Sequence, residues 1–304
     1  MVASTVYKVV VAFNRRATVV TALRYAPFKY AQGSHFLVKE LLSLVPPHDV
    51  YVEVFGGAAS LLFAKEPSKV EVYNDINSEL VNFFRVLRDD EKWRKLQEKL
   101  FLTPYSREEF NLARQPAEGL DDIERARRFF VKMQMSFSGK ADGFSYSKAS
   151  NPASAYFNRI AILGRFHERI RNIIIECLDF EDVIRRYDSP KTFFFCDPPY
   201  VGHSTRTSHL SLEMPLGDHE RLINALLRVR GKVLLLTYRH PIYEKLGERG
   251  WHLKILDVVL NLTKTTETEN RRQRRERCLW MNYQSRPSPS QITLSDFNEK
   301  FTGT

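Results

Sequence analysis

The sequence predicts an α/β fold in which a buried, mainly parallel sheet alternates with helices. Apolar runs of strand length without polar alternation recur along the chain, as in strands that are covered on both faces. These runs span residues 50–55, 70–73, 173–177, 192–196 and 232–236. Glycine turns or helical patterns follow several of the runs, and three runs end in polar side chains. In open α/β sheets, ligands bind beyond the carboxyl ends of the strands, so these ends are candidate site positions.

Length and composition are those of a soluble globular protein. The chain has 304 residues, of which 43% are hydrophobic and 27% are charged. The net charge of +10 suggests a polyanionic partner, although a solvated basic surface explains it equally well. Cys177, Cys196 and Cys278 are scattered through apolar runs, which indicates reduced thiols in a cytoplasmic protein. We expect no metal site, because no histidine pair has ligand spacing beside an acid. We also expect no membrane span, because no apolar run approaches about 20 residues.

The first clear element along the chain begins near residue 25. We interpret residues 1–24 as an extension or, over residues 7–13, as an extra edge strand; the apolar stretch there is too short for a signal peptide. Residues 25–34 are rich in turn formers. A short amphipathic helix follows and ends before two prolines; its apolar positions are Phe36, Leu37, Leu41 and Leu42.

Residues 50–75 have the pattern of a βαβ unit: strand, glycine turn, helix, strand, acid. Because Gly56 and Gly57 lack Cβ atoms, the turn tolerates unusual backbone angles and lets a ligand approach the main chain. The second strand ends at Asn74-Asp75, about 20 residues after the turn, where an acid usually holds a ribose hydroxyl pair. A glycine turn with no ligand explains this single pattern as well.

A largely helical segment then interrupts the α/β alternation. Helical patterns cover residues 78–87, 91–100, 107–113 and 123–135. The loop 136–146 mixes Lys140 with serines, glycines and aromatics, which suits contacts to phosphates and bases. A solvated loop anchored by Phe137 and Phe144 is the alternative. Since the alternation resumes only at residue 173, we interpret residues 77–172 as an insertion between two strands.

The last third of the chain completes the sheet. Helices at 219–230 and 241–246 flank the strand at 232–236, and residues 251–260 and 277–283 predict two antiparallel strands. We expect the basic run 271–277 to form a loop between them, either solvated or placed to neutralise phosphates at the edge of a nucleic-acid groove. Residues 285–304 are polar and predict a disordered tail.

The strand at 192–196 ends abruptly in Asp197-Pro198-Pro199-Tyr200. Both prolines lack a backbone donor, so the chain must leave the sheet there. Asp197 and Tyr200 then project where ligands bind. Taken alone, the stretch is equally consistent with a strand terminator in which Asp197 makes a local turn bond.

In their order along the chain, these elements resemble the Dam-like, α-group DNA adenine methyltransferases. The resemblance covers about residues 25–284. It rests on Pro27-Phe28-Lys29-Tyr30, Phe55-Gly56-Gly57, Asp75, the insertion, Asp179-Phe180, Asp197-Pro198-Pro199-Tyr200 and the closing strand Leu279-Trp280-Met281-Asn282-Tyr283. The Asp-Pro-Pro-Tyr motif is fairly specific, and the ordered set is strongly so.

The resemblance implies a Rossmann-like methyltransferase sheet. Residues 25–76 and 173–284 would form the catalytic domain, and residues 77–172 a target-recognition domain. The implied reaction transfers a methyl group from S-adenosyl-methionine to N6 of adenine, flipped out of a specific double-stranded DNA sequence. Asp197 and the Pro198 carbonyl would each accept a hydrogen of the adenine amino group, and Tyr200 would stack on the base.

The resemblance also implies a set of binding residues. Asp75 would hold the cofactor ribose, and Asp179 and Phe180 its adenine ring. The full cofactor set is Tyr30, Ser34, Phe55, Gly57, Asp75, Asp179, Phe180 and Asp197. Candidate DNA contacts come from the insertion and the basic run: Lys132, Gln134, Lys140, Arg271, Arg272, Arg274 and Arg275. We expect the enzyme to act on DNA as a monomer or a weak dimer.

The chain departs from the family pattern in two places. The usual Gly-Gly-Lys of the first loop reads Gln32-Gly33-Ser34, so a lysine that contacts the cofactor is missing, and Lys29 or Lys39 is a candidate to compensate. The second glycine of the turn is Ala59, a mild change. A degenerate DNA-binding protein without activity stays open. An RNA or N4-cytosine methyltransferase is a further alternative. The long spacing between Phe55 and Asp197 stands against an RNA enzyme, because it leaves room for a DNA-recognition insertion. The aspartate at position 197 stands against a cytosine enzyme, because such enzymes more often carry serine there.

Overall fold

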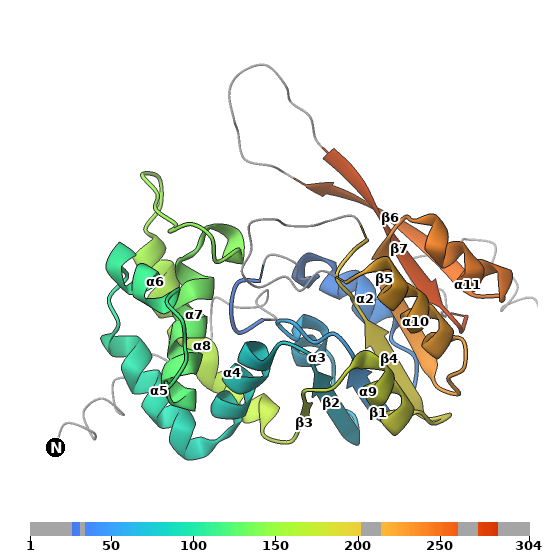
Figure 1. Cartoon of the computed structure of the whole chain (residues 1–304), viewed down its shortest axis with the longest axis horizontal. Coiled ribbons are helices and arrows are strands. Elements are labelled where there is room, and N and C mark those ends of the chain that lie inside the picture. Colours follow the sequence, from blue (N-terminus) through green and yellow to red (C-terminus); the bar gives the residue numbers. More distant parts are fainter. Residues whose placement is uncertain (1–25, 31–33, 202–213, 261–272, 285–304) are drawn as a thin grey trace, which may run out of the picture.

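The centre of the fold is a seven-stranded sheet with the strand order β3-β2-β1-β4-β5-β7-β6. The computed structural model describes residues 26–30, 34–201, 214–260 and 273–284. The strands are β1 (Val50–Glu53), β2 (Val70–Asn74), β3 (Ile174–Glu176), β4 (Thr192–Cys196), β5 (Lys232–Tyr238), β6 (His252–Leu260) and β7 (Gln273–Met281). Strands β1 to β5 are parallel, whereas β7 is antiparallel to both β5 and β6. Figure 1 shows β6 and β7 continuing past the end of β5 as a two-stranded ribbon.

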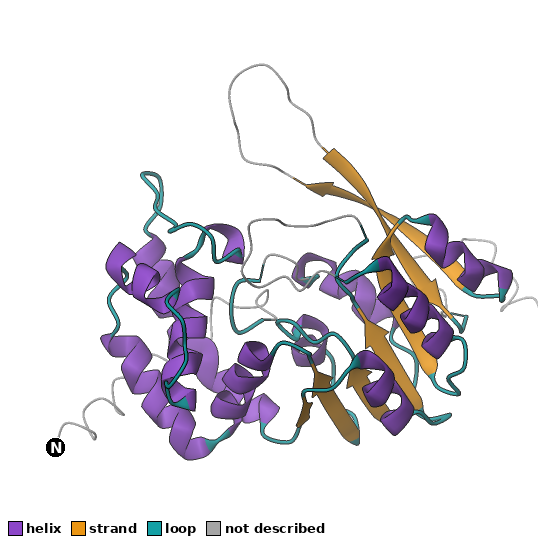
Figure 2. Ribbon diagram, in the orientation of Figure 1, coloured by secondary structure: helices purple, strands orange, loops and turns teal. Residues whose placement is uncertain are grey.

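Helices cover both faces of the sheet (Figure 2). One face packs against η1 (His35–Leu37), α2 (Val38–Leu44), α3 (Ser60–Ala64) and α4 (Ser78–Arg88). The opposite face packs against α9 (Phe180–Tyr187), α10 (Leu216–Leu226), η3 (Pro241–Tyr243) and α11 (Glu244–Glu248). None of the helices in the described ranges is both long and apolar enough to cross a membrane.

Strand β4 requires both helical layers, because all five of its side chains are buried. Phe193 and Phe195 belong to the hydrophobic cluster under α2 to α4. Phe194 and Cys196 point the other way, into the cluster under α9 and α10. Successive side chains of a strand point to opposite faces, so an uninterrupted apolar run is what a central, doubly covered strand needs. The prediction of such a strand from the sequence is confirmed.

The chain between β2 and β3 is helical. After α4 come α5 (Asp90–Leu102), α6 (Arg107–Ala113), α7 (Asp122–Met135), η2 (Phe137–Gly139) and α8 (Pro152–Ile170). Asn77, Asp89, Asp121 and Asn151 cap the first turns of α4, α5, α7 and α8 with side-chain oxygens that accept from backbone N–H groups. Figure 1 shows α5 to α8 gathered to one side of the sheet.

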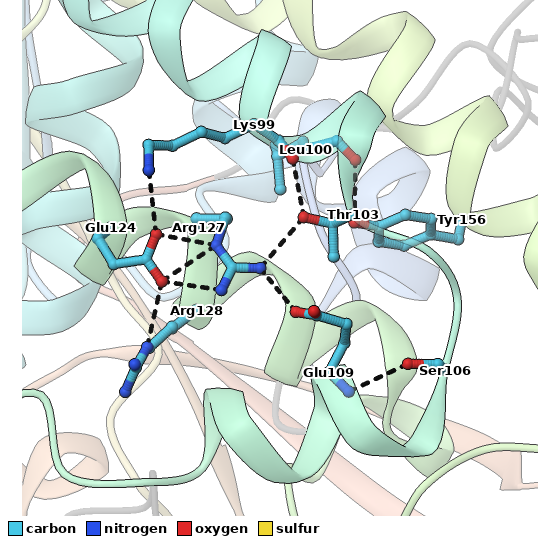
Figure 3. Close-up of polar contacts among 9 residues, drawn as sticks. All are labelled: Lys99, Leu100, Thr103, Ser106, Glu109, Glu124, Arg127, Arg128 and Tyr156. Carbon is cyan, nitrogen blue, oxygen red and sulfur yellow. Dashed lines mark hydrogen bonds and ion pairs between the residues drawn. The ribbon is translucent and has the colours of Figure 1, made fainter.

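An ion-pair network centred on Arg127 ties α5, α6 and α7 together (Figure 3). The Arg127 guanidinium pairs with Glu124 at 2.8 Å within α7 and with Glu109 of α6 at 3.0 Å. It also donates to the Thr103 hydroxyl, just after α5, at 3.1 Å. Burial would raise the pKa of Glu124, but Arg127 and Arg128 outweigh it and lower this pKa to about 2. The network therefore holds charged groups in a partly desolvated place where removing one partner would be costly.

Several sequence predictions need correction. Helices α8 and α9 lie where no helix was predicted. Strand β7 begins at Gln273, so Arg274 and Arg275 belong to a strand that pairs with β6 and not to a loop. Strand β1 ends at Glu53, two residues earlier than expected. The predictions for residues 1–24, Arg271, Arg272 and residues 285–304 lie outside the described residues.

Candidate active site

A cavity opens at the carboxyl ends of β1, β2 and β4, where the chain connections diverge to opposite sides of the sheet. From β1 the chain leads to β2 on one side, and from β4 it leads to β5 on the other. All the residues predicted to bind the cofactor line this cavity: Tyr30, Ser34, Phe55, Gly57, Asp75, Asp179, Phe180 and Asp197. Pro198 and Tyr200 line it as well. Segments that are far apart in the sequence are thus brought to one place.

The glycine turn after β1 is fixed by Asp75 at the end of β2. Gly57 has φ +50°, a conformation that glycine adopts without strain, and its N–H donates to Asp75 Oδ2 at 2.9 Å. The other carboxyl oxygen of Asp75 accepts from the Asn77 N–H at 2.8 Å. Ala59 also has positive φ, at 56°, which costs about 1 kcal/mol for a residue with a Cβ. The replacement of the family's glycine at this position is therefore less mild than the sequence suggested.

The acid of the Asp-Pro-Pro-Tyr motif bonds to the tyrosine of the same motif. The Tyr200 hydroxyl donates to Asp197 Oδ1 at 2.6 Å. The Tyr200 ring is half-buried and packs on the Tyr238 ring, with 4.4 Å between the ring centroids. Burial raises the pKa of Asp197, while the Tyr200 hydroxyl, the Arg277 charge and the Ser34 hydroxyl each lower it. Ser34, which stands where the family has lysine, thus lies near enough to the central acid to lower its pKa.

Glu53 is a cavity residue that the sequence analysis did not assign to the site. Its side chain accepts from the Tyr51 hydroxyl and the Leu62 N–H, both at 3.1 Å. Burial raises the pKa of Glu53 to about 8, although these hydrogen bonds oppose the shift. Glu53 could have been predicted from the sequence, because it is an acid at the end of β1, on the same edge of the sheet as Asp75 and Asp197.

Asn74 was missed as well. Its amide group bonds to the carbonyl of Val54 at 2.9 Å and to the carbonyl and N–H of Leu178 at 3.1 and 2.9 Å. Asn74 therefore fixes the ends of β1 and β2 against the segment that begins α9. The asparagine beside Asp75 was visible in the sequence, but only the sheet geometry reveals its partners.

Asp179 and Phe180 form the wall of the cavity at the start of α9. Asp179 caps this helix by accepting from the Glu181 N–H at 2.9 Å, and it pairs with Arg221 of α10 at 3.1 Å. The Arg221 guanidinium lies 4.8 Å from the centre of the Phe180 ring. The rings of Phe55 and Phe180 are 5.8 Å apart. The two rings form an apolar surface beside an acid, an arrangement that can hold a flat, amino-bearing ring.

The predicted DNA contacts fare differently. Lys140 is exposed on the loop after η2, and Lys132 is half-buried, which lowers the pKa of its amine. Gln134 is only 2% exposed, so its side chain is not placed to meet a base edge. Its main-chain carbonyl accepts a hydrogen bond from the Lys29 amine at 3.0 Å. Lys29 therefore anchors the first loop. Among the described residues that line the cavity, there is no lysine, arginine or histidine that compensates for the missing family lysine.

Comparison with known proteins identifies the class to which this fold and site belong. The family model of D12 class N6 adenine-specific DNA methyltransferases matches residues 34–241. The chain belongs to this family, whose members methylate adenine in DNA at specific sites. The resemblance found in the sequence and the predicted methyltransferase fold are thereby confirmed.

Individual relatives agree with the family. A type II methyltransferase, M1.LlaDCHI, from Lactococcus lactis subsp. cremoris is 27% identical over 72% of this chain and 84% of its own length. A DNA adenine methylase from Vibrio cholerae serotype O1 is 23% identical over 80% of this chain and 91% of its own length. A DNA N-6-adenine-methyltransferase from Escherichia phage P1 is 25% identical over 69% of this chain but only 29% of its own length.

Proposed function

We propose that the chain transfers a methyl group from S-adenosyl-methionine to N6 of an adenine that is flipped out of a specific sequence of double-stranded DNA. The observation that carries the choice of donor is the charge of the cavity. Asp75 and Asp197 line it beside Glu53, whose raised pKa of about 8 keeps it largely neutral, and no basic side chain is found among the described lining residues. Such a wall favours a positively charged ligand and disfavours a phosphate-bearing one. S-adenosyl-methionine supplies a methyl group on a positively charged sulfonium.

The proposed roles of the cofactor residues follow from their bonds. Asp75 keeps acceptor capacity on both carboxyl oxygens after its two backbone bonds, which suits a pair of ribose hydroxyls. Phe55 and Phe180 would hold the adenine ring of the donor, with Asp179 beside its amino group. Tyr30 and the Gly57 backbone would border the amino-acid end.

The proposed acceptor site is Asp197 with the Pro198 carbonyl. An adenine amino group is a poor nucleophile because its lone pair is delocalised into the ring. A carboxylate and a carbonyl that each accept one amino hydrogen would draw the nitrogen toward tetrahedral geometry and aim its lone pair. The bond from the Tyr200 hydroxyl holds the Asp197 carboxyl in place and leaves it room for a second donor. The half-buried Tyr200 ring offers a surface against which a flipped base can lie.

For DNA recognition we propose the helical segment α4 to α8 and its loop at residues 136–146. This loop exposes Lys140 together with the aromatic side chains of Phe137 and Tyr146, which are 54% and 73% exposed. Exposed aromatics beside basic groups suit stacking on bases and contacts to phosphates. Lys132 of α7, and Arg274 and Arg275 of β7, stay as predicted DNA contacts.

The substitution Asp197→Asn tests the proposed chemistry. It keeps the shape of the side chain but replaces one acceptor oxygen by a donor, so we expect methyl transfer to fall about 100-fold or more. Transfer is measured with labelled S-adenosyl-methionine on DNA whose target is first mapped by single-molecule sequencing in a methylation-free host. DNA binding should stay within about twofold of the wild type. The matched control is Asp182→Asn, because Asp182 lies on the exposed side of α9. Transfer at the normal rate by Asp197→Asn would exclude the proposed mechanism.

A further inference from the structure

Arg277 of β7 is buried among aromatic rings beside the proposed acceptor site. It is 7% exposed, and its register partner across the sheet is Tyr238 of β5. The guanidinium carbon lies 4.1 Å from the centre of the Tyr238 ring and 4.4 Å from that of the Tyr200 ring. Both distances are in the range of favourable cation–π contacts, which are strongest where water is excluded.

The surroundings of Arg277 do not explain its presence as a stabilising feature. Its Nη1 atom has no hydrogen-bond partner among the described residues. A buried guanidinium with an unpartnered donor costs free energy. A buried polar group of this kind in a native protein calls for an explanation, and function is one.

Tyr200 connects Arg277 to the central acid. Its ring packs on the guanidinium, while its hydroxyl donates to Asp197 Oδ1 at 2.6 Å. We propose that Arg277 is a positioning residue for methyl transfer: it fixes the Tyr200 ring and supplies the positive charge that balances the buried Asp197 carboxylate. This inference rests on the proposed function, because it concerns the same acceptor site.

The charged and titratable groups around Asp197 determine in which direction the loss of Arg277 shifts the pKa of Asp197. Burial raises the pKa of Asp197; Tyr200, Arg277 and Ser34 lower it. Among the described residues, the other titratable groups that interact with Asp197 are Tyr30 of the first loop, Glu53 of β1 and Cys196 of β4, and burial raises the pKa of each. Tyr30 and Cys196 are therefore neutral at working pH, and Glu53 is largely protonated below pH 8. Within the described part of the chain, Arg277 is the permanent positive charge that acts on Asp197, so its loss raises the pKa of Asp197.

The test compares Arg277→Met, which removes the charge, with Arg277→Lys, which keeps it. In the pH profile of kcat, the acidic limb of Arg277→Met should move to higher pH by about one unit, which is about a tenfold loss on that limb. The limb of Arg277→Lys should stay near that of the wild type. The matched control is Arg239→Met, since the Arg239 side chain is 73% exposed and pairs with Glu276 at 3.5 Å. Urea unfolding measures the stability of Arg277→Met beside that of the wild type and shows that the variant is folded under the conditions of the pH profile.

A direct titration separates this inference from the proposed function. The carboxyl ¹³C signal of Asp197, assigned with Asp197→Asn, should titrate at higher pH in Arg277→Met, whether or not the protein methylates DNA. Suppose that the wild type is active and that Arg277→Met has the same Asp197 titration and the same acidic limb as the wild type. This result would overturn the role of Arg277 and leave the proposed function intact. A wild type that transfers no methyl group to DNA would overturn the proposed function, while the shifted titration would still support the electrostatic role of Arg277.

Discussion

Glu53, Asp75 and Asp197 are acids around one cavity, Glu53 buried and the two aspartates half-buried, and this burial raises the pKa of each. Glu53 and Asp197 also repel each other when both are charged, which raises the pKa of Glu53 further. A cluster of this kind is unfavourable in the empty protein and becomes favourable when a cation enters. At the scale of single residues, the site is therefore organised to bind a positively charged donor.

The Glu53 carboxyl should make the stability of the protein depend on pH. Its pKa is about 8 in the folded state and near the ordinary value of 4.5 in the unfolded state. The folded state thus binds more protons between these values, and the free energy of unfolding falls as the pH rises through this window. In Glu53→Gln this contribution is absent. Relative to Glu53→Gln, the wild type should lose a few kcal/mol between pH 5 and pH 8, since one pKa unit corresponds to about 1.4 kcal/mol.

Urea unfolding at several pH values measures this difference. The matched control is Glu118→Gln, because Glu118 is exposed and should follow the wild type at every pH. Parallel curves for the wild type and Glu53→Gln would mean that Glu53 is not held in its protonated form.

Most residues of the candidate site could be predicted from the residue types at the ends of the strands. Gly57, Asp75 and Asp197 each follow an apolar run within two residues, and a parallel sheet brings such ends to one edge. Arg277 could not be found in this way. It lies in a basic run of β7, and only the antiparallel pairing with β5 brings it beside Tyr200.

At the scale of elements, the first loop joins the helical segment to the cavity. Arg159 of α8 donates to the Ala26 carbonyl at 2.6 Å, and the Lys29 amine donates to the Gln134 carbonyl of α7 at 3.0 Å. The Phe28 ring is buried against the rings of Phe83 and Phe129. The Tyr30 ring, two residues further along, lines the cavity. A movement of the helices on DNA would therefore be transmitted to a residue of the proposed cofactor site.

Gly139 of η2 allows the closest contact between these parts. It has φ +71°, and a Cβ atom there would lie 2.7 Å from the Lys29 carbonyl and 2.9 Å from the Tyr30 nitrogen. We expect Gly139→Ala to push the loop away, to destabilise the protein by about 1–3 kcal/mol and to weaken S-adenosyl-methionine binding several-fold. Calorimetric titration of the cofactor measures the binding.

Gly143→Ala is the matched control, because it lies in the same loop and a Cβ atom there meets nothing within 4 Å. Equal cofactor affinity in the two variants would show that the contact between Gly139 and the first loop does not position Tyr30.

Each element that was predicted from the sequence has one strong pattern. The elements that were not predicted have patterns that fit more than one structure. Helix α8 contains four consecutive apolar residues, 160–163, which look like a buried strand when helix and strand are judged by apolar runs alone. Its start was readable, because Asn151 caps it and Pro152 opens it. Helix α9 begins at Asp179-Phe180, which had been assigned to ligand binding only, although a capping acid fulfils both tasks. The predicted strand at 277–283 begins later than β7, because a run of arginines is typical of a solvated loop.

At the scale of the whole molecule, the hydrophobic core is continuous between the sheet and the helical segment. One cluster joins Tyr51, Phe193 and Leu279 of the sheet to Phe129 and Tyr156 of the helices. The helical segment was predicted as a separate domain, residues 77–172. A shared core of this extent instead leads us to expect that both parts unfold together.

The substitution Arg127→Met tests this cooperativity, because it breaks the network of Figure 3 far from the sheet. Leaving Glu124 and Glu109 without their partner should lower the free energy of unfolding by about 3 kcal/mol. Trp93 reports on the helices and Trp251 and Trp280 on the sheet. Urea unfolding is therefore followed by fluorescence in two backgrounds, Trp93→Phe and Trp251→Phe with Trp280→Phe. Both midpoints should coincide and should fall together in Arg127→Met. If only the Trp93 midpoint fell, the helical segment would be an independent folding unit, and the contact between Gly139 and the first loop would join two domains rather than parts of one.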